Sequence, residues 1–213
     1  MNDENTAESA LVYVVDDHDS MREALTTLLR SVDLNVLAFA SAQEFLALDK
    51  PDVPSCLILD VRLKGQSGLA VQEQIVAAAS NLPIIFITAY GDIEMSVKAM
   101  KNGAFDFLAK PFRDQNLLDA VASALLHDKQ RRDASGHVAG LRSLYAALSR
   151  REREVMSLVT GGLMNKQIAA NLDLSEITVK IHRKNAMIKM GARSLADLVL
   201  KAQALGINAD VTR

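Results

Sequence analysis

The 213-residue sequence predicts an α/β domain built on a doubly wound, five-stranded parallel sheet, followed by a small all-α domain. In the first half, short β-rich runs alternate with stretches of helical periodicity. Three of these runs are almost continuously apolar, which is typical of strands covered on both faces of a parallel sheet. Beyond about residue 128 the strand-like runs stop, and short helices separated by tight turns take their place.

Strands and helices alternate along the first half of the chain. A capping box of Ser41 with Glu44 opens the second expected helix, and Asp92 can cap the fourth. The expected strands are 11–16, 35–38, 56–60, 83–88 and 105–108. The expected helices are 20–31, 42–48, 67–79 and 93–102, with a fifth beginning near 114. This order predicts a doubly wound parallel sheet.

The second half is expected to contain only helices. Residues 128–147 form a charged, glycine-containing linker that is helical at its start, and the helical domain covers 148–208. Ser149 with Glu152 forms a capping box, and Gly161-Gly162 ends the helix that it opens. Helices are expected at 150–160, 165–172, 175–190 and 194–205. The second and third are joined by a tight turn, which is the spacing of a helix-turn-helix.

Charge is distributed unevenly between the halves. Residues 1–130 contain 10 basic and 19 acidic side chains, a net of −9, whereas residues 131–213 contain 14 and 7, a net of +7. The basic half favours a polyanionic partner, and chance variation of surface charge is the alternative. Apolar runs fall far short of the roughly 20 residues of a membrane span, and the polar N-terminus predicts no signal peptide. We therefore expect no membrane partner and a cytoplasmic location.

The single cysteine, Cys56, lies in an apolar run and is expected to be a buried thiol in a reducing compartment. One cysteine and four scattered histidines offer no spacing for a Cys/His zinc site.

Polar side chains gather where the expected strands end. Asp16 and Asp17 end the first strand, Asp60 the third and Thr88 the fourth, and Lys110 follows the fifth. Parallel sheets bind ligands at this edge. Three converging carboxylates need a compensating cation, most simply Mg²⁺, and a lysine and a hydroxyl beside that cluster suit a phosphoryl group. Each residue alone could instead be a helix cap or part of a turn.

Four motifs in this order resemble the receiver domain of two-component response regulators, a flavodoxin-like fold, over residues 9–127: Val14-Val15-Asp16-Asp17, Leu59-Asp60, Thr88-Ala89 and Lys110-Pro111. The resemblance implies that Asp60 accepts a phosphoryl group. It implies Mg²⁺ held by Asp16, Asp17, Asp60 and the backbone carbonyl of Arg62. Thr88 and Lys110 would sense the phosphoryl group, with Phe107 as an aromatic switch.

Some residues near this predicted site have other interpretations. Phe107 is as readily an ordinary core aromatic. His18 is expected to face solvent or to cap a helix. Where such receivers commonly have Met-Pro-Gly, this chain has Leu63-Lys64-Gly65. The missing proline predicts a looser loop, and Lys64 adds a cation near the site.

The helix expected at 175–190 has two distinct faces. Val179, His182, Ala186 and Met190 form an apolar stripe, whereas Lys180, Ile181 and Lys184 lie toward the opposite face with Arg183 on the flank. Lysine can meet base acceptors or phosphates in the major groove, and isoleucine can contact a thymine methyl group. A solvated cationic face is the alternative.

A longer match resembles the LuxR-type helix-turn-helix. It comprises Leu148-Ser149-x-Arg151-Glu152-x-Glu154-Val155, then Gly162-Leu163-x-Asn165-Lys166-x-Ile168-Ala169, then Leu174-Ser175-x-x-Thr178-Val179-Lys180-x-His182-Arg183. The resemblance implies base reading by Lys180, Ile181 and Lys184. It implies phosphate contacts by Asn165, Lys166, Thr178 and Arg183. The last helix would dimerise through Leu195, Leu198, Val199, Ala202 and Leu205, some of which must instead pack internally.

Together the halves resemble a response regulator of the NarL/FixJ type, and Arg62 and the run Thr88-Ala89-Tyr90-Gly91-Asp92 favour the FixJ branch. The resemblance implies a transcriptional regulator that acts as an activator and is not an enzyme. A sensor histidine kinase would phosphorylate Asp60. The protein would then dimerise through the face of the fourth expected helix and fifth expected strand, which contains Met95, Met100, Lys101 and Phe105. It would bind double-stranded promoter DNA and engage RNA polymerase.

Two other functions compete with this interpretation. A Mg²⁺-dependent phosphohydrolase with Asp60 as nucleophile needs an acid/base carboxylate two residues later, where this chain has Arg62. A DNA-binding protein with a vestigial receiver would act without phosphorylation, and the intact acidic set argues against it.

Overall fold

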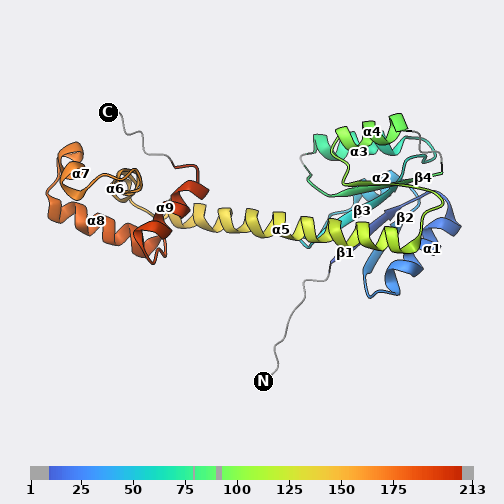
Figure 1. Ribbon diagram of the computed structural model, residues 1–213, viewed down its shortest axis with the longest axis horizontal. Helices are drawn as coiled ribbons and strands as arrows, with labels where there is room; N and C mark the ends of the chain where they lie inside the picture. Colours follow the sequence, from blue (N-terminus) through green and yellow to red (C-terminus); the bar gives the residue numbers. More distant parts are fainter. Residues whose placement is uncertain (1–9, 79, 90–92, 208–213) are drawn as a thin grey trace, which may run out of the picture. The chain divides into compact units, whose positions relative to one another are not determined.

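The structure, a computed structural model, describes residues 10–78, 80–89 and 93–207, and the chain divides into two compact units at residues 132 and 133 (Figure 1). Each unit is described by itself. The expected cap Asp92 and the rest of the run Tyr90-Gly91-Asp92 lie outside the described residues. None of the helices in these ranges combines the length and the apolar character needed to cross a membrane.

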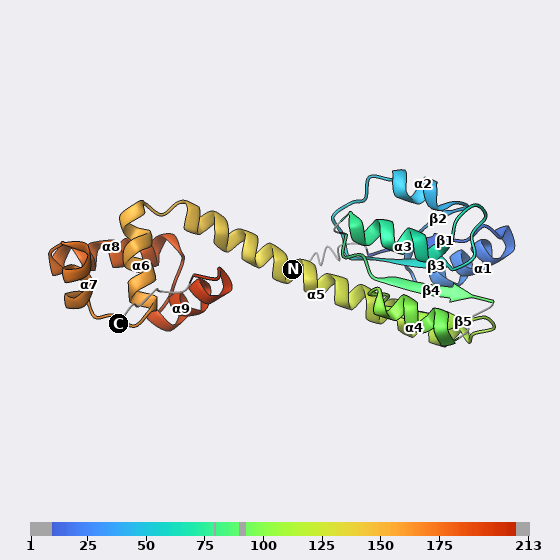
Figure 2. The same cartoon turned by 90° about the horizontal axis from the view of Figure 1, so that it is seen from above.

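The first unit contains the predicted five-stranded sheet. All its neighbouring strands are parallel, in the order β2-β1-β3-β4-β5 (Figure 2). The strands are β1 (Leu11–Val15), β2 (Asn35–Phe39), β3 (Ser55–Asp60), β4 (Ile84–Thr88) and β5 (Asp106–Ala109). The strand order reverses between β1 and β3, and such a switch point at the carboxyl ends is where doubly wound sheets bind ligands.

Helices cover both faces of this sheet because successive strand side chains point in opposite directions. Val12 and Val14 pack toward one face, and Tyr13 and Val15 toward the other. The first face is covered by α1 (Asp19–Arg30) and the first part of α5 (Asp114–Ala146). The second is covered by α2 (Ala42–Ala47), α3 (Gly68–Ala77) and α4 (Ile93–Lys101).

Cys56 of β3 is fully buried, as expected, and burial is the main reason that the pKa of its thiol rises to about 12. The thiol is therefore protonated and unreactive at neutral pH.

Helix α5 is longer than the sequence predicts, because it continues through the expected linker to Ala146. Within α5, Asp128 anchors the helix to the sheet: its buried carboxylate accepts the Ser55 backbone N–H at 3.0 Å and hydrogen bonds from Arg131 and Arg132. The helix does not end within the expected linker, because each glycine in a helix interior costs only about 1 kcal/mol. Local composition therefore suggested a break that the helix does not have.

The second unit is helical, as predicted. Its helices after α5 are α6 (Arg150–Thr160), α7 (Asn165–Leu172), α8 (Glu176–Lys189) and α9 (Leu195–Ala204). The Ser149–Glu152 capping box is confirmed, and Ser175 and Ser194 cap the two helices that follow them. Leu148, Met156, Ala186 and Leu198 belong to one buried cluster that holds α8 against its neighbours.

Candidate functional sites

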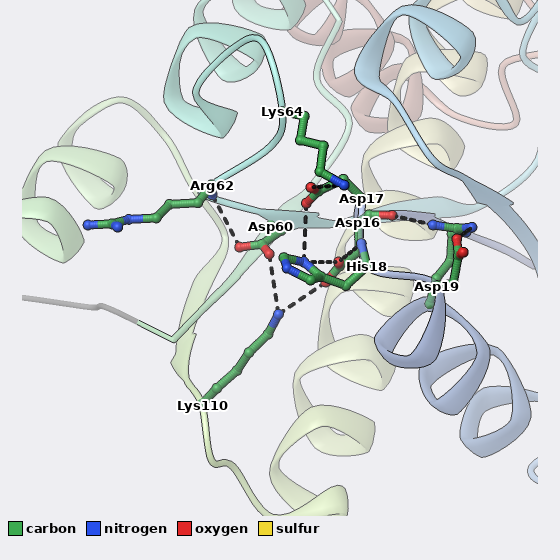
Figure 3. Close-up of polar contacts among 9 residues, drawn as sticks. Asp16, Asp17, His18, Asp19, Asp60, Arg62, Lys64 and Lys110 are labelled. Carbon is green, nitrogen blue, oxygen red and sulfur yellow. Dashed lines mark hydrogen bonds and ion pairs between the residues drawn. The ribbon is translucent and has the colours of Figure 1, made fainter.

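The carboxyl ends of the parallel strands bring the predicted acidic residues together. Asp60 is the last residue of β3, Asp16 follows β1, and Lys110 follows β5. The Lys110 Nζ lies 3.0 Å from Asp16 Oδ2 and 3.3 Å from Asp60 Oδ2 (Figure 3). Both carboxylates are buried, so one ammonium group is shared between two desolvated negative charges.

A third carboxylate, that of Asp17, completes the cluster. Its Oδ1 is buried and accepts no hydrogen bond from the described residues; the His18 Nδ1 lies 3.2 Å away. One ligand atom from each of Asp16, Asp17, His18 and Asp60 can be chosen so that all lie within 4.8 Å of one another. A buried carboxylate oxygen without a donor, here Asp17 Oδ1, beside two further carboxylates suits a hard cation such as Mg²⁺, so the donor set fits this ion.

His18 and Lys64 both lie beside the acidic cluster, as expected for Lys64. The His18 side chain is 64% exposed, as expected, but its Nδ1 also lies 3.3 Å from Asp16 Oδ1. The exposed Lys64 ammonium lies 3.6 Å from Asp17 Oδ2. Two groups outside the predicted set can therefore influence the charge at the site (Figure 3).

The Asp60 carboxyl has a perturbed acidity. Burial is the largest influence and raises its pKa, and the nearby Asp16 charge raises it further. The Arg62 N–H, which donates to Asp60 Oδ1 at 3.2 Å, and the Lys110 ammonium act in the opposite direction. The net pKa is raised, as is common for carboxyl groups at functional sites.

Thr88 and the cavity beside Asp60 complete this edge of the sheet. Thr88 ends β4 and is buried, and its carbonyl accepts the Lys110 N–H at 2.7 Å. A cavity of about 300 Å³ is lined by His18, Ser20, Met21, Asp60, Arg62, Thr88, Ala89 and Lys110. The structure therefore places all five predicted strand-end residues at one edge, beside a space that could admit a phosphoryl group.

Phe107 is half-buried in β5. Its ring centroid lies 6.4 Å from that of Phe86, and it packs against the core on the α2–α4 face. This position agrees with a core aromatic and leaves the predicted switching role a prediction.

Gly68, at the start of α3, is a residue that the sequence analysis missed. A Cβ atom there would lie 2.4 Å from the Asp60 carbonyl oxygen, so no larger residue fits without displacing the backbone that carries Asp60. The loop before it is closed by the Gly68 N–H, which donates to the Val61 carbonyl at 2.8 Å, and by a bridge between Arg62 and Ser67. A glycine opening a helix beside a functional strand end was the available signal.

A second candidate site lies on α8. Lys180, Ile181 and Lys184 are exposed, whereas Val179, Ala186 and Met190 of the predicted inner stripe are buried and His182 is half-buried. Neither Lys180 nor Lys184 forms a hydrogen bond or ion pair with any residue that the structure describes. Both ammonium groups are thus available for an external anion.

Two other lysines position α8. Lys189 at its end lies 2.7 Å from the buried Glu152 carboxylate of α6, and Lys201 of α9 donates to the carbonyls of Met190 and Gly191 at 3.0 and 2.8 Å. The Lys189 hydrogen bond is the main reason that the pKa of Glu152 is lowered, followed by the Ser149 N–H. These contacts hold the helix whose opposite face carries Lys180 and Lys184.

The residues predicted to contact phosphates have different surroundings. Arg183 Nη1 donates to Asn165 Oδ1 at 3.3 Å, which joins α8 to the start of α7. The Thr178 hydroxyl lies 2.8 Å from the capping hydroxyl of Ser175. Lys166 is exposed. A shallow depression of about 450 Å³ is lined by Asn165, Lys180, Arg183, Lys184, Met187, Ile188 and Ala192.

The predicted dimer surfaces contain both exposed and buried residues. Phe105 directly precedes β5, and its ring packs 5.5 Å from that of His127, with the core on the α1 and α5 face; the dimer face of the fourth helix and fifth strand stays a prediction. Met100 is exposed, with Val97 beside it on α4. On α9, Leu198 and Ala202 are buried inside the unit, whereas Leu195 and Leu200 are exposed.

Both parts of the chain match known families. Residues 12–122 match the response regulator receiver domain, and residues 146–202 match the bacterial regulatory proteins of the luxR family. The chain is therefore a two-component response regulator with a LuxR-type DNA-binding domain, and it belongs to this family of transcriptional regulators.

Relatives of known sequence match over nearly the whole chain. It is 58% identical to nodulation protein W of Bradyrhizobium diazoefficiens over 203 residues, which cover 95% of this chain and 89% of that protein. It is 45% identical to response regulator protein TodT of Pseudomonas putida over 197 residues, covering 92% and 87%. The solved structure of response regulator StyR is 47% identical, with a TM-score of 0.84 and coverage of 92% and 98%.

Family membership decides between some of the competing functions. The relatives are regulators and not enzymes, which removes the phosphohydrolase alternative. Receiver domains bind Mg²⁺ at an acidic site, and this chain has an acidic cluster at the corresponding edge of its sheet. A receiver domain also implies a histidine kinase as partner, and a LuxR-type domain implies DNA.

Proposed function

We propose that this protein is a phosphorylation-dependent transcriptional activator, with a receiver at 9–127, a linker at 128–147 and a DNA-binding domain at 148–208. A sensor histidine kinase transfers a phosphoryl group to Asp60, and this promotes dimerisation, promoter binding and engagement of RNA polymerase. The observation that carries the proposal is the shared Lys110 ammonium, which lies within 3.3 Å of both Asp16 and Asp60 beside an accessible cavity.

Asp60 is the proposed nucleophile. One of its carboxylate oxygens attacks the phosphorus of a phosphohistidine; an O–P bond forms as the N–P bond breaks, and the imidazole leaves and takes up a proton. Asp16, Asp17, Asp60 and the Arg62 carbonyl would hold Mg²⁺, which when bound neutralises carboxylate and phosphoryl charge. Lys110 and Thr88 then bind phosphoryl oxygens, and Phe107 turns inward.

The proposed consequence is a change in association. A local change of charge can bias a bistable surface, and the exposed apolar side chains of α4 and α9 supply the surfaces for a dimer. Two copies of α8 then enter the major groove of a two-fold operator. Lys180, Ile181 and Lys184 contact bases, and Asn165, Lys166, Thr178 and Arg183 contact phosphates.

Phosphorylation is tested directly. Full-length protein is incubated with acetyl phosphate and Mg²⁺, and intact masses of wild type and Asp60→Asn are compared. We expect one phosphoryl group on wild type only. Beryllofluoride, a mimic of the phosphoryl group, is then used in two measurements. Sedimentation with and without it measures dimer formation, and titration of one operator with and without it measures DNA affinity. Full phosphorylation of the variant would contradict the proposal. So would a dimerisation constant and a DNA affinity that are the same with and without beryllofluoride.

DNA contacts are tested on α8. If Lys180 or Lys184 contacts a base, its change to alanine should cost about 1–3 kcal/mol and relax preference at one base pair. If it contacts a phosphate, the affinity for all DNA sequences should fall by the same factor. The slope of log affinity against log salt concentration should then become shallower by about one. Lys129→Ala, which removes an exposed lysine of α5 in the first unit, is the matched control. Unchanged affinity for both α8 variants would show that this helix does not enter the groove.

A further inference from the structure

Three isoleucines are exposed along one line of α8. Ile177, Ile181 and Ile188 are 71%, 54% and 66% exposed. At 100° per residue they lie within about 40° of one another, opposite the buried Val179 and Ala186. A single exposed apolar residue is ordinary, but a line of three on one helix marks a surface that contacts something.

The neighbours of these isoleucines indicate what that surface contacts. Lys184 lies beside this line and Lys180 flanks it on the same side of the helix, and neither has a partner among the described residues. A surface that alternates cationic and branched apolar groups is complementary to the floor of the major groove. There, acceptor atoms of the bases alternate with the 5-methyl groups of thymine. The charge therefore favours DNA over an apolar protein partner.

Ile177 occupies the part of α8 that would come nearest to the bases. Ser175 is the cap residue and accepts the Thr178 N–H at 3.1 Å, so Ile177 lies in the first turn of the helix. In a helix-turn-helix the N-terminal residues of the second helix contact base edges. Ile181 follows one turn later, whereas Ile188 lies roughly 16 Å further along the helix axis than Ile177.

We infer that Ile177 is a second apolar base-reading residue, which contacts the 5-methyl group of a thymine one helical turn before the contact made by Ile181. This inference rests on the proposed DNA binding through α8 and adds a specificity determinant to it. Ile177 is largely exposed, so its side chain contributes little to the domain core, and its truncation should leave the fold intact.

The test uses full-length protein with beryllofluoride and Mg²⁺. Wild type, Ile177→Ala, Ile181→Ala and Ile188→Ala each select sequences from a random duplex pool. Thymines of the selected site are then replaced one at a time by deoxyuridine, which lacks only the methyl group. Ile188→Ala is the matched control, since it removes the same side chain from the same face at the far end of the helix. Thermal melting of each variant verifies the fold.

We expect wild type to lose about fourfold in affinity when the methyl group facing Ile177 is removed, the ratio that corresponds to one buried methyl group. Ile177→Ala should be insensitive to that replacement but keep the response at the thymine read by Ile181. Ile188→Ala should respond like wild type at both positions.

Three outcomes would overturn the inference in distinguishable ways. If Ile177→Ala selects the same bases and shows the same deoxyuridine response as wild type, Ile177 is not a base contact and the proposed function stands. If wild type selects no sequence, the proposed function fails as well. If Ile177→Ala changes the sedimentation of the protein without changing its base preference, the line of isoleucines contacts protein instead.

Discussion

Replacement of both Gly136 and Gly140 by alanine should stabilise the middle of α5 by about 2 kcal/mol. Residues 133–140 follow the anchor at Asp128 and precede Leu141, the first buried residue of the second unit. Seven of these eight residues are exposed and Val138 is half-buried. This part of the helix is therefore held by backbone propensity and not by packing.

The magnitude follows from the surroundings of the two glycines. No heavy atom lies within 4 Å of a Cβ built at either position, so alanine fits without a clash. Each replacement then gains the full difference in helix propensity, about 1 kcal/mol. If the segment opens as one unit, the two gains add, and the open state becomes about 30-fold less populated.

Amide hydrogen exchange measures this population. Under conditions where exchange reports the opening equilibrium, amides of 133–140 should exchange about 30-fold more slowly in the double variant and about fivefold more slowly in each single variant. Amides of α3 provide an internal control and should not change. Equal exchange in wild type and the double variant would refute the reasoning, because it would show that something other than helix propensity holds this segment.

Three further changes test other parts of the structure. Asp60→Asn removes one of three clustered carboxylates, so thermal denaturation should show a higher Tm without Mg²⁺ and a smaller gain on adding Mg²⁺ than for wild type; a lower metal-free Tm would contradict this. Burial raises the pKa of Asp128, but hydrogen bonds from two arginines and a backbone amide outweigh it and leave the pKa lowered. Ionised Asp128 therefore stabilises the fold above its unfolded pKa of about 3.9, and this contribution is lost as the pH falls through the lower folded value. Urea denaturation between pH 7 and pH 3 should thus show a weaker pH dependence for Asp128→Asn, and equal slopes would count against the assignment. Ser149→Ala removes the cap of α6 and should lower the free energy of unfolding by about 1 kcal/mol. An unchanged urea midpoint would show that the capping box does not stabilise the domain.

The sheet and its functional edge were predictable because their signals are local. Buried parallel strands appear as apolar runs, and residues such as Asp60 and Thr88 could be located simply because they end those runs. Once the strands were known to be parallel, their ends had to meet at one edge. The capping serines of the second unit were predictable for the same reason, since each bonds within three residues.

Contacts between distant residues could not be predicted in this way. Asp128 of α5 accepts a hydrogen bond from the Ser55 N–H, 73 residues earlier in the chain. The need for Gly68 arises from its approach to the Asp60 carbonyl, a distance that only the folded backbone sets. Phe105 was included in the dimer face through the family resemblance, which does not reveal which side of the sheet its ring packs against.

The charge balance at the strand ends links the resting site to the proposed phosphorylation. Asp16, Asp17 and Asp60 with Lys110 carry two uncompensated negative charges when all are ionised, and one divalent cation neutralises them. Phosphorylation would replace the single charge of Asp60 by almost two, so the positive groups must then serve the phosphoryl oxygens. Lys110 already touches Asp60 at 3.3 Å but is also bound to Asp16 at 3.0 Å. Stronger attraction to the phosphoryl group should therefore draw this lysine away from Asp16, and that movement is a physical route by which the modification could reach β5.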